Sequence, residues 1–177
     1  MNYFTPELLA LGLTNDDSTL NEQERLWDEA GARFVAYLDT VRPKMPPGLR
    51  KFDADFYLHD ALIQGMGQQG RAFVIVVQLD TSPRSLLTLE YDLVEEPIIH
   101  RDVLPVALRG QGTSVDWQYD EIEMIGGDPP TWRHSILCSN GWEVRLHFRD
   151  LTVREMLALI PASTSTSGSV PSLAPSS

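Results

Sequence analysis

The chain of 177 residues carries 25 acidic and 14 basic side chains, which gives a net charge of −11 and a pI of about 4.6. Its length and its 42% hydrophobic content are those of a single globular domain with a sizeable core. Because binding to nucleic acid or to an anionic membrane requires clustered Lys and Arg, the charge argues against both and favours a basic protein as partner.

The cysteine content and the N-terminal residues indicate the cellular compartment in which the protein is expected. Cys138 is the single cysteine, so no disulfide can form within the chain and no oxidising compartment is implied. The first ten residues lack a basic stretch followed by an apolar one, so no signal peptide is expected. The longest strongly apolar run, Phe73–Val77, is too short to span a bilayer. We therefore predict a soluble, cytoplasmic protein.

Residues 1–48 are predicted to be helical. Thr5-Pro6-Glu7 has the pattern of a helix start, and Thr19-Leu20-Asn21-Glu22 matches a capping box that predicts a long helix to about Val41. The apolar positions of this long helix form one stripe: Trp27, Ala30, Phe34, Tyr37, Leu38 and Val41. Such a stripe can bind a partner, but helices usually bury it on their own sheet, which is our prediction. Pro43, Pro46, Pro47 and Gly48 are expected to end the helical part.

Residues 56–150 are predicted to be rich in β-strands, after a short linker at Leu49–Asp55. The expected strands are Phe56–Met66, Arg71–Asp80, Leu86–Val94, Thr113–Ile125 with a bulge near Asp120–Glu121, and the two arms of a hairpin in Thr131–Asp150. A second capping box at Thr152-Val153-Arg154-Glu155 predicts a short helix over 152–160. Residues 161–177 are mostly Ser, Thr, Pro and small residues, which predicts a disordered tail.

These elements predict an α+β fold. The N-terminal helices are expected to pack on one face of an antiparallel sheet of about five or six strands, with a short helix near the C-terminus. The order of the elements along the chain indicates one domain over 1–160.

The hairpin in Thr131–Asp150 offers the most specific prediction of register. Asn140-Gly141 between two alternating runs is typical of a two-residue type I′ turn. That turn would place His134 directly opposite His147 on one face of the sheet. The other face would anchor the core through Trp142, Val144, Leu146 and Phe148.

Two functions are open for the predicted His134 and His147 face. Facing imidazoles can bind one metal ion, although no third ligand is evident, and the alternative is a pair of solvated histidines. In the predicted register this face also carries Trp132, Ile136, Arg145 and Arg149, with Trp132 stacked on Arg149. We therefore predict that these four residues form the partner-binding surface.

Two other motifs are interpreted as structural. Gly65-Met66-Gly67-Gln68-Gln69-Gly70 fits the dinucleotide pattern literally, but a strand-forming run follows where a helix is needed, so the glycines are expected to serve a turn and a bulge. His59 and Asp60 are neighbours on a predicted strand, so they would point to opposite faces and bond backbone groups instead of each other. No nucleophile elbow is present. The sequence thus predicts no catalytic residue and no cofactor.

Two short strings carry a resemblance. Met1-Asn2-Tyr3-Phe4-Thr5-Pro6-Glu7 and Leu58-His59-Asp60-Ala61-x-Ile63 resemble segments of uncharacterised bacterial proteins that are grouped as a domain of unknown function. The Leu-His-Asp-small string also resembles the first strand of some small immunity proteins of bacterial toxin systems. The resemblance implies a bacterial cytoplasmic α+β protein and, for the second match, an inhibitor.

The sequence therefore leads to one principal function and one alternative. The principal one is a non-catalytic binding protein, of the immunity type, that inhibits a basic protein partner. The alternative is a small-ligand or metal-binding protein that uses the His134 and His147 face.

Overall fold

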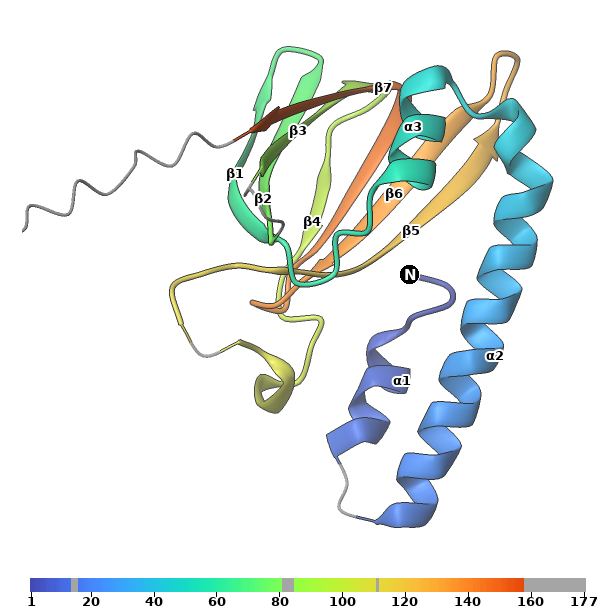
Figure 1. Ribbon diagram of the computed structural model, residues 1–177, viewed down its shortest axis with the longest axis vertical. Helices are drawn as coiled ribbons and strands as arrows, with labels where there is room; N and C mark the ends of the chain where they lie inside the picture. The colour runs from blue at the N-terminus through green and yellow to red at the C-terminus, as the bar shows by residue number, and fades with distance from the viewer. Residues whose placement is uncertain (14–15, 81–84, 111, 158–177) are drawn as a thin grey trace, which may run out of the picture.

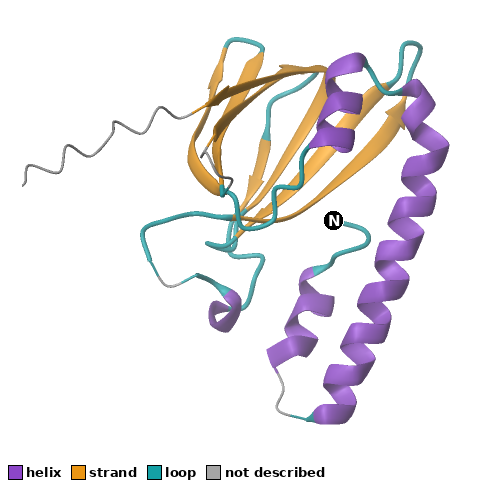
Figure 2. Cartoon of the chain, viewed as in Figure 1, coloured by secondary structure: helices purple, strands orange, loops and turns teal. Residues whose placement is uncertain are grey.

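The protein has an α+β fold, as predicted, in a computed structural model that describes residues 1–13, 16–80, 85–110 and 112–157 (Figures 1 and 2). A curled antiparallel sheet is flanked by a long helix and shorter helices. The predicted tail, 161–177, lies outside the described residues. None of the described helices is both long enough and apolar enough to cross a lipid bilayer.

The helical part extends further along the chain than predicted. It comprises α1 (Pro6–Ala10), the 3₁₀ turn η1 (Leu11–Leu13), α2 (Asp17–Val41), η2 (Arg42–Lys44) and α3 (Pro47–Asp55). Helix α2 begins two residues before the predicted cap, because the Asp16 side chain accepts the Thr19 N–H at 2.9 Å. The apolar stripe of α2 is buried or half-buried, as predicted for a helix that packs within its own domain.

Helix α3 corrects the prediction of a linker over Leu49–Asp55. Pro47 is predicted to end the helical part, but it occupies the first turn of α3, where a missing N–H costs nothing and the fixed φ angle suits a helix. Leu49 and Phe52 of α3 are buried, at 0% and 3% exposure. The helix therefore contributes directly to the core.

In the described part of the chain the sheet has seven strands. They are β1 (Leu62–Gln69), β2 (Ala72–Leu79), β3 (Ser85–Leu93), β4 (Ile98–His100), β5 (Trp117–Gly126), β6 (Thr131–Cys138) and β7 (Glu143–Leu157). Their order is β1-β2-β3-β7-β6-β5, with the short β4 paired to β7 outside this path. A 3₁₀ turn, η3 (Val106–Leu108), lies between β4 and β5. Strand β1 begins six residues later than predicted, because residues 56–61 form a turn that leads into the sheet.

The sheet curls until its two ends meet. Leu62 at the start of β1 forms a bridge with Asp116 before β5. The Trp117 N–H donates to the Ala61 carbonyl at 2.9 Å, and the Ile63 N–H donates to the Val115 carbonyl at 2.8 Å. The incoming segment 56–61 is therefore fixed against β5.

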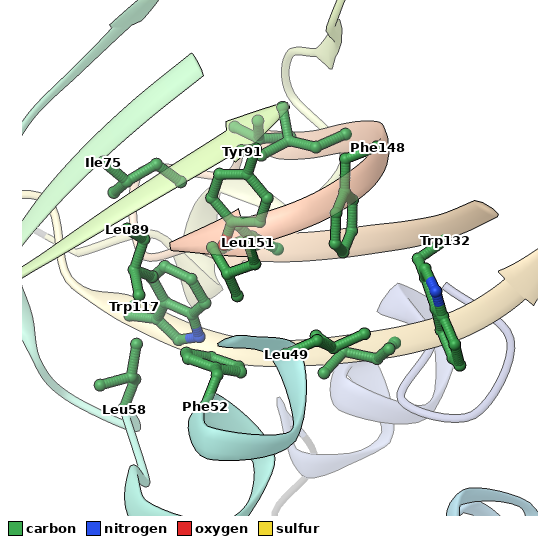
Figure 3. Close-up of a cluster of buried hydrophobic side chains, with 14 of the residues drawn as sticks. Leu49, Phe52, Leu58, Ile75, Leu89, Tyr91, Trp117, Trp132, Phe148 and Leu151 are labelled. Carbon is green, nitrogen blue, oxygen red and sulfur yellow. The ribbon is translucent and has the colours of Figure 1, made fainter. Parts of the chain in front are cut away.

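The interior of the curled sheet holds the hydrophobic core (Figure 3). Leu49 and Phe52 of α3 point into the same cluster as side chains from three strands: Leu89, Tyr91, Trp117 and Phe148. In strands β2 and β3 buried positions alternate with half-buried or exposed ones, as the pattern of Leu87, Leu89, Tyr91 and Leu93 predicts. The glycine string also behaves as predicted, with a bulge between Ile63 and Gly65 and a turn at Gly70.

Helix α2 covers the outer edge of β5 and then extends beyond the sheet, where α1 lies beside it (Figure 1). The Tyr37 hydroxyl of α2 accepts the Met124 N–H of β5 at 2.7 Å. An otherwise unpaired edge group is thereby satisfied, which protects the strand from pairing with another chain.

The C-terminal helix predicted over 152–160 is wrong for the described residues. Strand β7 continues to Leu157, and its second half pairs with all of β3, from Leu157 opposite Ser85 to Phe148 opposite Leu93. Pairing over this distance in sequence outweighs a local capping signal. Residues 158–160 lie outside the described part of the chain.

The predicted register of the β6–β7 hairpin is wrong by one residue. Trp132 faces Phe148, and His134 faces Leu146 instead of His147. The loop has three residues, because Cys138 exchanges backbone hydrogen bonds with Trp142 and Gly141. Successive side chains of a strand point to opposite faces of the sheet, so a shift of one residue in the pairing moves the β6 side chains to the other face. His134 therefore points into the core, whereas His147 points away from it.

Replacing Gly141 by alanine tests this turn. Gly141 has φ +84°, in the left-handed region where a Cβ atom costs about 1–2 kcal/mol. We expect Gly141→Ala to lower the free energy of unfolding by that amount in urea denaturation. Gly67→Ala is the control, since Gly67 lies in β1 and an added Cβ would meet nothing within 4 Å. Equal stability of the two variants would contradict the described turn.

Candidate functional site

The two histidines predicted to share a metal ion lie on opposite faces of the sheet. His134 is fully buried, whereas the half-buried His147 contacts Glu95 at 3.0 Å and Thr131 at 2.9 Å. The register that would bring His134 and His147 face to face is the one that the structure corrects. Within the described ranges, no three His, Cys, Asp or Glu side chains are grouped so that they could hold a metal ion.

The predicted partner-binding surface is also divided by the corrected register. Trp132 and Ile136 are core residues with 0% exposure. Arg145 is half-buried and bonds Glu143, and Arg149 is exposed. These four residues therefore do not form one surface, and Trp132 faces Phe148 instead of stacking on Arg149.

A cavity of about 290 Å³ lies between α2, the end of α3, the segment 56–59 and β5. We call it the aromatic cavity. Its walls are Phe4, Trp27, Phe34, Leu38, Phe52, Asp53, Phe56, Tyr57, Leu58, His59, Gln118, Tyr119, Asp120 and Ile122. These walls include two carboxylates and neither Lys nor Arg. A largely apolar cavity with a few placed polar groups is the usual form of a ligand site.

The aromatic side chains of the walls support one another. The Phe4 ring lies 4.8 Å from Trp27, and Trp27 lies 4.7 Å from Tyr119, measured between ring centroids. Phe34 meets Phe4 edge to face at 5.9 Å. Three segments far apart in sequence thus form one wall, which fixes its shape before any ligand arrives.

A buried carboxylate holds Phe4 in this wall. Glu121 of β5 has 0% exposure and accepts the backbone N–H groups of Asn2, Tyr3 and Phe4 at 2.6–2.7 Å. Three charge-assisted hydrogen bonds satisfy a buried carboxylate well. The N-terminal segment is therefore a fixed part of the cavity.

Glu143 binds the same segment and makes stability depend on pH. Burial alone would raise its pKa, but hydrogen bonds from Arg145 and the Met1 amine outweigh burial and lower it. A lowered pKa in the folded state stabilises the fold above the unfolded value of about 4.5, and this contribution is lost as the pH falls through the folded pKa. We expect the free energy of unfolding to decline on acidification below that value.

Glu143→Gln should remove part of this decline and lower stability at pH 7 by about 1–3 kcal/mol, because a neutral amide cannot replace the paired carboxylate. Urea denaturation between about pH 3 and 7 measures both effects. Glu155→Gln, on the exposed end of the same strand, is the control. An unchanged dependence on pH in Glu143→Gln would contradict this role.

Asp120 joins the aromatic cavity to the core through a chain of hydrogen bonds. One carboxylate oxygen accepts Trp117 Nε1–H at 2.9 Å, and the other lies 2.9 Å from His134 Nε2. The second ring nitrogen, Nδ1, lies 2.9 Å from the Tyr91 hydroxyl. Burial, aided by the charge of Asp120, raises the pKa of Tyr91 well above 10, so the hydroxyl stays protonated.

The contacts of His134 follow from what its partners can do. A carboxylate accepts hydrogen bonds, so Nε2 is the donor toward Asp120, whereas the Tyr91 hydroxyl can donate to Nδ1 or accept from it. Asp120 reaches the cavity wall, where its side chain is 25% exposed.

The mouth of the cavity carries an exposed aromatic residue. Tyr57 is 85% exposed and stacks on His59 with the ring planes 9° apart. His59 Nδ1 lies 2.9 Å from the Asp60 carboxylate, which corrects the prediction that these neighbours cannot pair: they lie in a turn, not on a strand. Burial, followed by the nearby Tyr57 and Asp60, raises the pKa of Tyr119.

The thiol of the single cysteine is unreactive. Burial raises the pKa of the Cys138 thiol to about 12, so at neutral pH it remains a thiol. It also lies in the core, away from the cavity walls.

No local pattern in the sequence predicts the aromatic cavity, because its walls come from four separate segments. Trp27 and Phe34 are predicted as part of the helix stripe, without a partner for either. The recurrence of aromatic residues at Phe4, Trp27, Phe34, Phe56 and Tyr57 was the signal that could have found it. Comparison with models of protein families, with curated proteins and with solved structures found no match to this chain.

Proposed function

We propose that this chain is a non-catalytic binding protein for a basic protein partner, and that the aromatic cavity receives a cationic side chain of that partner. An inhibitor of the immunity type is the form of this function that the sequence resemblance suggests. The observation that carries the proposal is the composition of the cavity: ring side chains with Asp53 and Asp120, and no Lys or Arg in the walls. Such walls favour a cation with an apolar stem.

The exposed Tyr57 supports a contact with another molecule at the mouth. Tyrosine is among the residues that contribute most to protein interfaces, since its ring gives a large contact area with little loss of conformational freedom. Its ring is already ordered by stacking on His59. Part of the entropy cost of binding is therefore met before the partner arrives.

The charge of the whole chain supports the same class of partner. A net charge of −11 attracts a basic protein over a distance and speeds association at low salt. The acidic residues Glu22, Glu29 and Asp39 on the solvent side of α2 are paired with Arg25 or Arg42, so they add less to this field than unpaired carboxylates would. The long-range attraction of a basic protein therefore depends mainly on the acidic side chains outside these ion pairs.

Selection from a random peptide library displayed on phage, with the intact protein immobilised, tests this proposal. We expect the enriched peptides to carry Lys or Arg and to bind several-fold more weakly when salt rises from about 50 mM to about 500 mM. Tyr57→Ala should weaken them at least about tenfold. Val106→Ala, which removes another strongly exposed apolar side chain outside the cavity walls, should have no effect. Enriched peptides without basic residues, or peptides indifferent to Tyr57→Ala, would contradict the proposal.

A further inference from the structure

The carboxylates of the aromatic cavity already accept hydrogen bonds from the protein, which leaves fewer acceptor sites for a ligand than free carboxylates would. Both oxygens of Asp120 already take part in contacts, with Trp117 and His134. Asp53, which is 9% exposed, accepts Arg42 Nε at 2.6 Å. Three of the four carboxylate oxygens in the walls are therefore engaged within the protein, and the negative potential comes mainly from Asp120, because Asp53 is paired with Arg42.

This arrangement distinguishes between kinds of cation. The ammonium group of an unmodified lysine has three N–H donors, and each donor that loses water without gaining an acceptor costs binding free energy. A trimethylated ammonium group has the same charge and no N–H donor. It needs only a negative potential and apolar or aromatic walls, and cation–π attraction to aromatic rings favours it further.

The walls meet that requirement. Seven side chains with six-membered or indole rings line the cavity: Phe4, Trp27, Phe34, Phe52, Phe56, Tyr57 and Tyr119. The Phe4, Trp27 and Tyr119 rings are held against one another at 4.7–5.9 Å, so this wall need not reorganise around a ligand. A volume of about 290 Å³ leaves room for a bulky cationic head together with part of its stem.

We propose that the aromatic cavity selects a methylated lysine side chain of the partner over an unmodified one. This inference rests on the proposed function, since it specifies which cationic side chain of the basic partner enters the cavity. The cation, which has no N–H donor, lies among the rings, Asp120 balances its charge, and Tyr57 contacts the lysine stem at the mouth.

Isothermal titration of the intact protein with a matched set of peptides tests the inference. A basic peptide with one central lysine is used in three forms: unmodified, Nε-trimethylated, and with a neutral carbon in place of the charged nitrogen. We expect the trimethylated peptide to bind about tenfold more tightly than the other two, since it alone combines charge with the absence of donors. Equal or weaker binding of the trimethylated peptide would overturn the inference.

Variants locate the effect in the cavity. Tyr57→Ala should abolish most of the preference for the trimethylated peptide, whereas Tyr57→Phe keeps the ring and should retain it. Because Tyr57 is 85% exposed, neither change should alter the melting temperature, which serves as the check of folding. A preference that survives Tyr57→Ala unchanged would place recognition elsewhere and overturn the inference.

The outcomes separate this inference from the proposed function. If unmodified and trimethylated peptides bind equally well, the selection for methylation is wrong and the basic partner stands. If none of the peptides binds and the phage selection yields no basic sequence, both proposals fall. If free choline binds as tightly as the trimethylated peptide, the cavity takes a small molecule and the assignment to a protein side chain is overturned.

Discussion

Gly48→Ala is expected to lower the free energy of unfolding by about 3 kcal/mol or more, because a side chain at this position has no room. A Cβ atom on Gly48 would lie 1.5 Å from the Leu151 carbonyl oxygen of β7. The obstacle is backbone in the middle of the sheet, so α3 would have to move away. With it would move Leu49 and Phe52, which are both buried in the core.

Urea denaturation followed by circular dichroism measures this change. Gly31→Ala is a matched control, because Gly31 lies inside α2 and an added Cβ would meet nothing within 4 Å. It should instead stabilise the protein by about 0.5–1 kcal/mol through better helix propensity. A Gly48→Ala protein as stable as the Gly31→Ala protein would show that α3 does not dock on β7 as described.

Asp120→Ala is expected to destabilise the fold by about 2–4 kcal/mol, since two buried donors would each lose a partner at about 1–3 kcal/mol. The donors are Trp117 Nε1 and His134 Nε2, and both side chains have 0% exposure. The loss extends inward, because Asp120 holds the His134 ring whose Nδ1 lies 2.9 Å from the Tyr91 hydroxyl.

Thermal and urea denaturation of Asp120→Ala measure this cost, with Asp55→Ala as the control. Asp55 is an exposed carboxylate at the end of α3, so its removal changes the net charge equally and should alter stability by no more than about 0.5 kcal/mol. Tyr91→Phe should cost about 1 kcal/mol and should not add fully to Asp120→Ala, since both act on one chain of hydrogen bonds. Full additivity would contradict that coupling.

The parts of the fold that follow from local pattern could be predicted from the sequence. The alternation in Leu86–Val94 and the β-branched run in Arg71–Asp80 gave two strands within two residues of their observed ends. The apolar stripe of α2 likewise identified its buried face. These segments can be predicted locally, because the spacing of their apolar residues is set by the face that each buries and does not depend on which element packs against it.

The predictions were wrong where one sequence pattern is compatible with two local structures, or where pairing between distant strands overrides a local pattern. Asn140-Gly141 suits a two-residue turn, but a three-residue loop also needs a glycine with positive φ, and the choice between them decides which face His134 occupies. Pro47 both ends one helix and begins the next. The capping pattern at Thr152 was overridden by pairing with β3, which no local pattern reveals.

The candidate site could not be predicted because it exists only in the folded chain. Phe4 lies in the cavity wall because its backbone N–H binds the carboxylate of Glu121, more than a hundred residues away. Tyr57 lies there because the start of β1 pairs with the segment before β5. The sequence predicts His134 as a candidate residue, but for a metal site on the face of the sheet away from the core, whereas it lies in the core. Its role is to hold Asp120 from within the core.

The central claim, that a basic partner is recognised in the aromatic cavity, is tested most directly by nuclear magnetic resonance. A basic peptide from the phage selection is titrated into labelled protein while the side-chain signals of Trp27, Tyr119 and Ile122 are followed. The account predicts that the largest shifts fall on these cavity residues and disappear in Tyr57→Ala. Largest shifts on the solvent side of α2 or on β4, with the cavity signals unmoved, would contradict it.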